Sequence, residues 1–332
     1  MMGARAGWLR AGLVSCGLVI ASCVTVFAAG PYPAGPYPAG PVRIVVGFGA
    51  SSTADIVARL VGKHLEEQLG KPVIVENRPG NSSMLAAEAV ARAPNDGRTL
   101  FMATVANTLN PAHMKSGFDL GKDLQPIALL GIVPNILVVN PSVPVKTVGE
   151  LIALAKAKPG SLTFATSGSW TASYMAAELF NLKAGTHIVS VPYQGGANQA
   201  ITDLLTGRIN LMFNVAAALA PHVAAGKLTA LAVGQPKRTA IMPDVPTMDE
   251  AGLSGFDVGV WIGLLAPAGT APEIIDTLAR FSNQALQQPS IKEALKAQGI
   301  DVLGSTPEEF ATFIQNDSRK WRALLETMGS KE

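Results

Sequence analysis

Two loops rich in glycine and hydroxyl residues each follow a strand-like segment and open a helix-like one. The first covers residues 47–53 (Gly-Phe-Gly-Ala-Ser-Ser-Thr) and the second covers residues 165–171 (Ala-Thr-Ser-Gly-Ser-Trp-Thr). In open α/β sheets, ligands bind beyond the carboxyl ends of the strands, where backbone amides and helix N-termini attract anions. We therefore expect the two loops to face each other across a cleft and to bind a negatively charged ligand.

The candidate binding residues come mainly from these loops and from a third at residues 191–197, which places Tyr193 and two glycines before another helix. Each type has an ordinary alternative role, since serine and threonine also cap helices and large aromatic side chains usually pack in cores. The predicted ligand-binding residues in the first part of the chain are Phe48, Ser51, Ser52, Thr53, Asp55 and Thr104, and those further along the chain are Ser167, Gly168, Trp170, Thr171, Tyr193, Gly195, Ala197 and Asn214.

Signatures of catalysis are scarce in this sequence. The four histidines are scattered, with no His-Glu-x-x-His pattern, no P-loop and no Gly-x-Ser-x-Gly elbow. The first loop does resemble a dinucleotide fingerprint, and Glu76 ends the next strand, but Ser52 replaces the third glycine that close helix packing requires. We predict a protein that is not an enzyme and has neither metal nor cofactor, with a nicotinamide-dependent oxidoreductase as the remote alternative.

The N-terminal residues have the layout of a secretory signal. Arg5 and Arg10 precede an uncharged apolar stretch that ends in small residues, which predicts a signal peptide over residues 1–28 and a Pro/Gly-rich leader over residues 29–40. A second reading takes residues 20–23 (Ile-Ala-Ser-Cys) as a lipobox, in which Cys23 would carry a lipid anchor. Both readings place the protein outside the cytoplasm, in the periplasm.

The net charge of the chain argues against one class of binding partner, and its cysteine content argues against disulfides. The chain has 26 Lys+Arg and 24 Asp+Glu, so loss of Arg5 and Arg10 leaves 24 of each and no net charge. A balanced surface argues against nucleic acid, because binding phosphates requires concentrated basic charge. Cys16 and Cys23 both lie in the export segment, so conventional cleavage leaves no disulfide.

The rest of the chain alternates strand-like and helix-like segments, which predicts an α/β protein with mostly parallel sheets. The expected organisation is two lobes joined by two crossing segments, with lobe 1 formed by residues 41–138 and 264–332 and lobe 2 by residues 139–263. Strands are expected at 42–46, 72–76, 99–103, 136–140, 162–165, 188–191, 211–213, 228–233 and 258–266, and helices at 54–69, 84–92, 151–158, 173–180, 197–205, 272–287, 290–298 and 307–328. Capping boxes are predicted at Thr147/Glu150 and at Thr306/Glu309, where Pro307 takes the first helical position.

From about residue 41 to residue 329 the sequence resembles the Bug receptors, the solute-binding proteins of tripartite tricarboxylate transporters. The matches to that family's motifs keep their order along the chain. They are Val46, Phe48 and Asp55, then Glu76-Asn77-Arg78-Pro79-Gly80, Asp96-Gly97-Arg98-Thr99-Leu100, Ser167-Gly168, Val191-Pro192-Tyr193, Pro243-Asp244-Val245-Pro246-Thr247, Glu250-Ala251-Gly252, Trp261-x-Gly263 and Ala266-Pro267-Ala268-Gly269-Thr270.

The resemblance implies a type II periplasmic-binding-protein fold that closes on a small carboxylate and delivers it, as a monomer, to membrane permease subunits. A receptor that passes the liganded state to a sensor protein is the alternative. The first loop departs from the family's Pro-rich, Gly-Gly form, and Trp170 and Tyr174 stand where the family usually has glycine and histidine. This aromatic bulk favours a changed specificity, toward an aromatic or otherwise partly apolar carboxylate.

Overall fold

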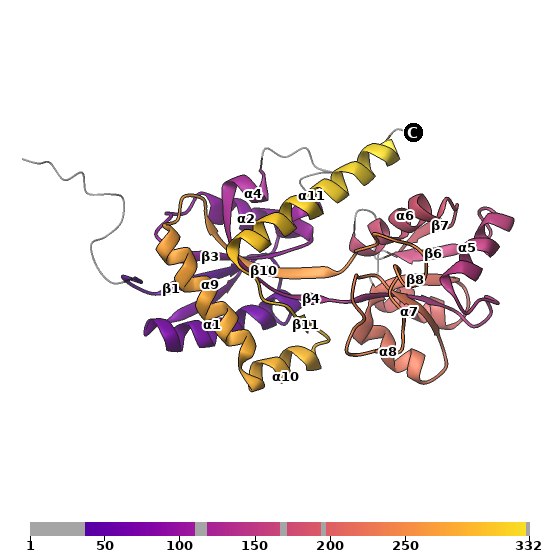
Figure 1. Cartoon of the computed structure of the whole chain (residues 1–332), viewed down its shortest axis with the longest axis horizontal. Coiled ribbons are helices and arrows are strands. Elements are labelled where there is room, and N and C mark those ends of the chain that lie inside the picture. The colour runs from indigo at the N-terminus through magenta and orange to yellow at the C-terminus, as the bar shows by residue number, and fades with distance from the viewer. Residues whose placement is uncertain (1–36, 110–117, 167–170, 194–196, 330–332) are drawn as a thin grey trace, which may run out of the picture. The chain divides into compact units, whose positions relative to one another are not determined.

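The computed structural model describes residues 37–109, 118–166, 171–193 and 197–329, and the chain course is shown in Figure 1. The predicted signal peptide and most of the leader lie outside the described residues. No helix in the described part of the chain is long and apolar enough to cross a membrane.

The first sheet has six strands in the order β11-β4-β10-β3-β1-β2. Its strands are β1 (Val42–Val46), β2 (Val73–Asn77), β3 (Thr99–Thr104), β4 (Leu124–Val133), β10 (Val260–Pro267) and β11 (Asp301–Val302). Strands β1, β2 and β3 are parallel, whereas β10 runs antiparallel to both β3 and β4. The continuous apolar run of β1, buried at four of its five positions, is typical of a strand covered on both faces.

The helices of this first lobe come from both ends of the chain. They are α1 (Thr53–Leu69), the short η1 (Asn81–Ser83), α2 (Met84–Ala91), α4 (Leu120–Asp123), α9 (Pro272–Gln287), α10 (Pro289–Ala297) and α11 (Pro307–Gly329). The buried residues of α1 and α9 belong to one core cluster with those of β1, β4 and β10. Helix α9, near the C-terminus, therefore packs on the lobe that the N-terminal strands begin.

The second sheet has five strands in the order β7-β6-β8-β5-β9. They are β5 (Asn135–Val139), β6 (Thr163–Thr166), β7 (Val189–Pro192), β8 (Leu211–Val215) and β9 (Thr229–Val233), with helices α5 (Val148–Ala157), α6 (Ala172–Ala184), α7 (Ala197–Leu205) and α8 (Ala216–Ala224). Four phenylalanines form the centre of this lobe, with neighbouring rings stacked, tilted or edge-on at centroid distances of 5.4–6.5 Å; they are Phe164, Phe180, Phe213 and Phe256.

The chain passes between the two sheets at Pro134 and again just before Val260. Residues 135–138, expected in lobe 1, belong to β5 of the second sheet, and residues 260–263, expected in lobe 2, belong to β10 of the first. The difference arises because a run of apolar residues predicts a buried strand but does not indicate which sheet it joins. Pro134 carries no N–H for a sheet ladder, and it separates β4 from β5.

Both predicted capping boxes are present. Thr147 Oγ1 accepts from the Glu150 backbone N–H at 3.1 Å, and Glu150 Oε2 accepts from the Thr147 N–H at 3.3 Å. Thr306 and Glu309 form the same reciprocal pair at the start of α11, with distances of 3.2 and 2.8 Å.

Candidate ligand-binding site

In each sheet the carboxyl ends of the parallel strands lie on the side from which the chain crosses to the other lobe. We call this row of strand ends the facing edge of the sheet. In the first sheet β4 runs parallel to β3, since both pair antiparallel with β10, and β4 leads directly through Pro134 into lobe 2. In the second sheet β9 runs parallel to β8, since both pair antiparallel with β5, which enters from lobe 1. The topology therefore sets the strand ends of β1–β4 opposite those of β6–β9, on either side of the two crossings (Figure 1).

The loop after β1 is organised by the start of α1. Ser52 has an extended backbone and is the N-cap, with its side chain accepting from the Asp55 N–H at 3.3 Å. Phe48 packs against the lobe-1 core, and its carbonyl accepts from Asn77 Nδ2 at 3.1 Å. Ser51 is exposed, and Thr53, the first residue of α1, is half-buried. These four predicted residues thus lie together at the carboxyl end of β1.

Asp55 is 2% exposed, and both of its carboxylate oxygens accept hydrogen bonds from within the lobe. Arg59 donates to both, at 2.9 and 3.0 Å, while Asn77 Nδ2 donates to Oδ1 at 2.8 Å and the Ser51 N–H donates to Oδ2 at 3.0 Å. Burial alone would raise the pKa of Asp55, but the hydrogen bonds from Arg59, Asn77 and Ser51 outweigh it and lower the pKa below its usual value. Asp55 therefore links the loop after β1 to Asn77 at the end of β2, and both of its carboxylate oxygens are bonded to residues of its own lobe.

We expect Asp55→Asn to lower the free energy of unfolding by about 2 kcal/mol at neutral pH, because the amide cannot accept all of these bonds. A lowered folded pKa means that the carboxylate stabilises the protein above the unfolded pKa of about 4 and that this contribution is lost as the pH falls through the folded value. The difference between variant and wild type should thus shrink in acid. Urea unfolding across this pH range measures it, with the exposed Asp276→Asn as control, and a difference independent of pH would contradict the prediction.

The loop after β2 is held against the end of β1 by Gly47. A Cβ placed on Gly47 would lie 1.9 Å from Ser83 Oγ and 2.6 Å from Ser83 Cα, so only glycine permits this approach. The non-glycine residues that the structure describes with positive φ all follow β1 or β2; they are Ser51, Asn81, Ser82 and Ser83, at 45–76°. Such strained backbone clusters at functional sites, so its location supports this edge of lobe 1 as the candidate site.

A tight turn follows β3 on the same edge. Thr104 is buried, and its Oγ1 accepts from the Ala106 N–H at 3.3 Å. The Thr104 N–H donates to Asn107 Oδ1 at 3.0 Å, which orients the carboxamide of Asn107, a fully buried residue. Thr104, the last residue of β3, was among the residues predicted from the sequence, whereas Asn107, three residues further on, was not.

In lobe 2 the described candidates also lie at strand ends. Thr171 is the N-cap of α6 and accepts from the Tyr174 N–H at 3.4 Å. Tyr193 directly follows β7, with its hydroxyl donating to Asp203 Oδ2 at 3.0 Å, and Ala197 is the first residue of α7. Asn214 lies near the end of β8, opposite Ile136, next to the crossing. Four of the predicted residues lie outside the described part of the chain: Ser167, Gly168, Trp170 and Gly195.

Several buried polar atoms at these edges have no hydrogen-bond partner among the described residues. They are Ser83 Oγ after β2, Asn107 Nδ2 after β3, Asn214 Nδ2 at the end of β8 and Gln235 Nε2 after β9. The atoms His64 Nε2 and Ser282 Oγ share this property, but they lie on helices α1 and α9 rather than at strand ends. Buried polar groups are normally paired, so their concentration at the strand ends marks this region for binding.

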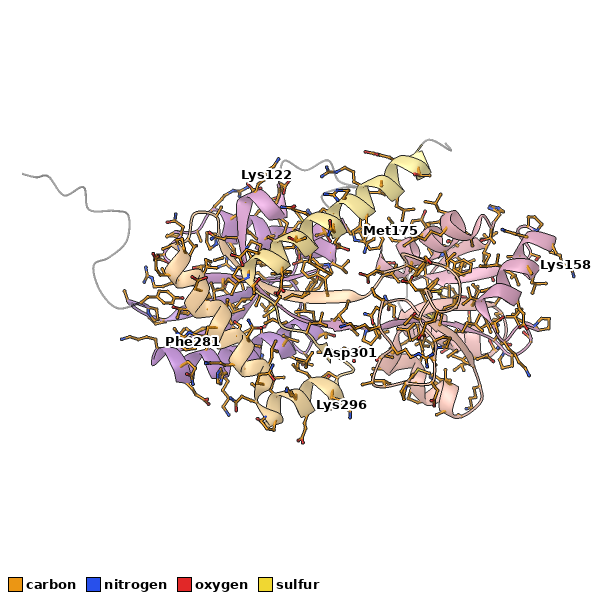
Figure 2. The ribbon with its side chains drawn as sticks, viewed as in Figure 1. Lys122, Lys158, Met175, Phe281, Lys296 and Asp301 are labelled. Atoms are coloured by element: carbon orange, nitrogen blue, oxygen red, sulfur yellow. The ribbon has the colours of Figure 1, made fainter. Side chains whose placement is uncertain are left out.

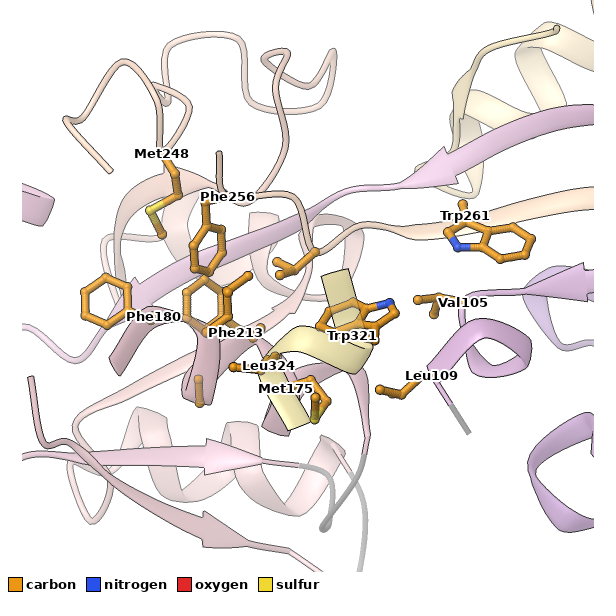
Figure 3. Close-up of a cluster of buried hydrophobic side chains, with 14 of the residues drawn as sticks. Val105, Leu109, Met175, Phe180, Phe213, Met248, Phe256, Trp261, Trp321 and Leu324 are labelled. Carbon is orange, nitrogen blue, oxygen red and sulfur yellow. The ribbon is translucent and has the colours of Figure 1, made fainter. Parts of the chain in front are cut away.

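Helix α11 ties the two sides of the site together. Asp317, 5% exposed, accepts at Oδ2 from Thr108 Oγ1 (2.6 Å), Trp261 Nε1 (2.9 Å) and Trp321 Nε1 (3.1 Å). Lys320 pairs with Asp317 Oδ1 at 2.6 Å and donates to the Asp257 carbonyl of the returning crossing at 2.7 Å. Figure 3 shows Trp321 among side chains of both lobes, including Val105 and Met175, which belong to one buried cluster with it.

A second contact between the lobes lies beside β11. Asp301, labelled in Figure 2, forms hydrogen bonds with the Thr239 side chain and the Ala240 backbone of lobe 2. Burial is the main effect on its carboxyl and raises its pKa above the usual value. Nearby, a Cβ on Gly299 would lie 2.7 Å from the Ala217 side chain of α8, so the lobes approach closely on this side also.

A separate pocket of about 440 Å³ lies at the amino-terminal ends of strands in the first sheet. Its lining residues are Pro41, Val42, Arg43, Ile74, Glu76, Pro94, Asp96, Arg98 and Thr99. It includes the beginnings of β1 and β3, away from their carboxyl ends, and so is separate from the candidate site.

Two α/β lobes with facing strand ends and two crossings define the class of the periplasmic solute-binding proteins. The model of the tripartite tricarboxylate transporter family receptors matches residues 57–330, and the chain belongs to that family. It is a solute-binding receptor, not an enzyme, and the family acts outside the cytoplasm on small carboxylates together with transporter permeases.

Individual relatives agree with this assignment. The protein BugT of Bordetella pertussis is 34% identical over 296 residues, which cover 87% of this chain and 90% of BugT. The malate-bound MatC of Rhodopseudomonas palustris is 31% identical and superposes with a TM-score of 0.68, covering 87% of this chain and 99% of MatC. An adipate-bound protein of R. palustris is also 31% identical, with a TM-score of 0.71 and coverages of 88% and 98%.

Proposed function

We propose that this receptor binds a small dicarboxylate between the facing strand ends of its lobes and passes it to the permease subunits of a tripartite tricarboxylate transporter. The observation that carries the proposal is the topology, which sets the N-terminus of α1, capped by Ser52, and that of α6, capped by Thr171, at the two facing edges. Helix N-termini and their hydroxyl caps bind carboxylates without a dedicated cation.

The two structural neighbours support a dicarboxylate, since one holds malate and the other adipate. Tyr174, in the first turn of α6, is half-buried and packs against the buried core cluster, so it is an aromatic residue close in sequence to the Thr171 cap. The ligand-binding role of the predicted residues, including those outside the described part, belongs to this proposal. An aromatic or otherwise partly apolar carboxylate is the alternative ligand class at the same site.

The proposal is tested by titrating the full-length mature protein with malate, adipate, citrate, glutamate and benzoate in a calorimeter and by thermal unfolding. We expect at least one acid to bind and to raise the unfolding midpoint, since a ligand present at about 100 times its Kd stabilises the folded state by about 2.7 kcal/mol. Binding of none of these acids would overturn the function. Tight binding of citrate or glutamate without benzoate would reject only the aromatic form.

The proposed function also requires that the protein is exported from the cytoplasm. An extracytoplasmic receptor needs a signal such as the one predicted at residues 1–28, or a lipid anchor at Cys23. Mass spectrometry of the mature N-terminal peptide separates these routes, and an intact Met1 on protein from the periplasm would exclude both.

A further inference from the structure

Two asparagines, the fully buried Asn107 in lobe 1 and the half-buried Asn214 in lobe 2, share the same unusual arrangement. Asn107 Oδ1 accepts from the Thr104 N–H at 3.0 Å, and Asn214 Oδ1 accepts from the Val215 N–H at 2.8 Å. In each case the Nδ2 donor is buried and has no partner among the described residues. The backbone bond fixes which way each carboxamide points, because an N–H can be accepted only by the oxygen.

The two side chains lie on the two facing edges of the site. Asn107 follows β3, which is the neighbour of β1 in the first sheet, and Asn214 is in β8, which is the neighbour of β6 in the second. Asn214 pairs with Ile136, one residue from the start of β5, so it lies beside the crossing from lobe 1. Each lobe thus has one oriented amide donor at the end of the strand that neighbours the strand leading into its predicted anion-binding loop.

We propose that Asn107 and Asn214 are ligand-binding residues that together donate to the acceptor oxygens of one ligand, and so select for carboxylate, hydroxyl or carbonyl groups against an ammonium group. This inference rests on the proposed carboxylate-binding function. A buried donor left unpaired is costly, whereas a hydrogen bond to a charged acceptor is among the stronger ones. Because their own oxygens already accept backbone N–H groups, the two amides face the ligand as donors.

The test replaces each donor while keeping the anchored oxygen. In Asn107→Asp and Asn214→Asp a carboxylate oxygen still accepts from Thr104 or Val215, but an oxygen replaces the free NH₂ group. At about pH 8, where an ordinary carboxyl is ionised, we expect each variant to bind malate, adipate, citrate or benzoate about 10-fold to 100-fold more weakly than the wild type. Because a buried carboxylate without a cation is costly, each unliganded variant should also unfold at a lower temperature than the wild type, Asn107→Asp more so than the half-buried Asn214→Asp.

Asn210→Asp is the matched control. Asn210 directly precedes β8, at the far end of that strand from Asn214, and its Oδ1 likewise accepts from a backbone N–H, that of Thr163, at 2.9 Å. The same chemical change there should leave affinity unchanged. Ligand class is read from matched pairs, malate against aspartate and adipate against 2-aminoadipate, and the wild type should prefer the acid without the ammonium group.

The outcomes separate the two proposals. If the wild type binds none of the acids, the proposed function fails. If it binds them and both aspartate variants bind equally well, the function stands and the role of the two asparagines is overturned. Tighter binding of the amino acids by the wild type would overturn the selectivity. An equal loss of affinity in the Asn210→Asp control would show that the added charge, and not the lost donor, weakens binding, and would overturn the role of the two amides.

Discussion

Gly47→Ala is expected to destabilise lobe 1 by about 3 kcal/mol and to abolish the stabilisation of the protein by carboxylates. The new Cβ would lie 1.9 Å from Ser83 Oγ, 2.5 Å from Ser83 Cβ and 2.6 Å from Ser83 Cα, which is part of the backbone. A side-chain rotation does not relieve contacts with Cβ and Cα, so the loops after β1 and β2 must separate. Overpacking of this kind costs about 1–3 kcal/mol or more, and here it displaces the loop predicted to bind the ligand.

Gly49→Ala in the same loop is the control, because a Cβ at Gly49 has no atom within 4 Å. It should change the free energy of unfolding by less than about 0.5 kcal/mol. The double variant Gly47→Ala/Ser83→Gly should recover part of the loss, since it removes the Oγ and Cβ contacts and suits the φ of 76° at position 83. Thermal unfolding with and without malate or adipate measures all three, and equal behaviour of the two single alanine variants would contradict the prediction.

Asp317→Ala should lower the free energy of unfolding by about 3–5 kcal/mol. The substitution leaves two indole N–H groups, the Thr108 hydroxyl and the Lys320 ammonium without the acceptor that they share. Removal of one partner from a buried charged network costs this much because the remaining groups stay desolvated. The unfolding temperature should fall by roughly 10 °C.

The control for this variant is Glu308→Ala, an exposed acid in the first turn of the same helix. It should lower stability by no more than about 0.5 kcal/mol. Asp317→Asn should fall between the two, since it keeps an acceptor oxygen for the indoles but loses the ion pair with Lys320. A fall of less than about 1 kcal/mol in Asp317→Ala would mean that the network is replaced by solvent and does not hold α11 in place.

Elements with regular local signals were predicted well. The capping boxes at Thr147 and Thr306 are present because the bonds that form them join residues three apart, so the sequence contains both partners. Strand β4 was missed, because Pro126 and Gly131 interrupt its apolar run. Pro126 lies where the ladder between β4 and β10 shifts register, and Gly131 leaves room for β11, since a Cβ there would lie 3.0 Å from the Asp301 carbonyl oxygen.

Helix α8 was also missed. Its sequence is rich in alanine and contains Pro221 inside the helix, so it has neither a clear amphipathic period nor a side-chain cap. Its place is set by packing instead, since Ala216 and Leu219 are fully buried in the lobe-2 core. Tertiary burial outweighs the local penalty of the proline.

By itself the sequence predicted the class of protein and the alternation of strands and helices, both of which are confirmed, and it indicated the loops at which we expect an anion to bind. These properties depend on local residue order: apolar periodicity, caps, glycines and hydroxyls next to strand ends. They identified Ser52 and Thr171 as residues at helix starts, where the structure finds them as N-caps.

The tertiary structure alone decided which distant residues meet at those loops. Asp55 binds Asn77, Gly47 contacts Ser83, and Asp317 of the last helix accepts from Thr108 and Trp261. Such pairings depend on strand order and on the crossings between lobes, which no local pattern contains. For the same reason the donors of Asn107 and Asn214, which have no partner among the described residues, became visible only once the bonds to their oxygens were known.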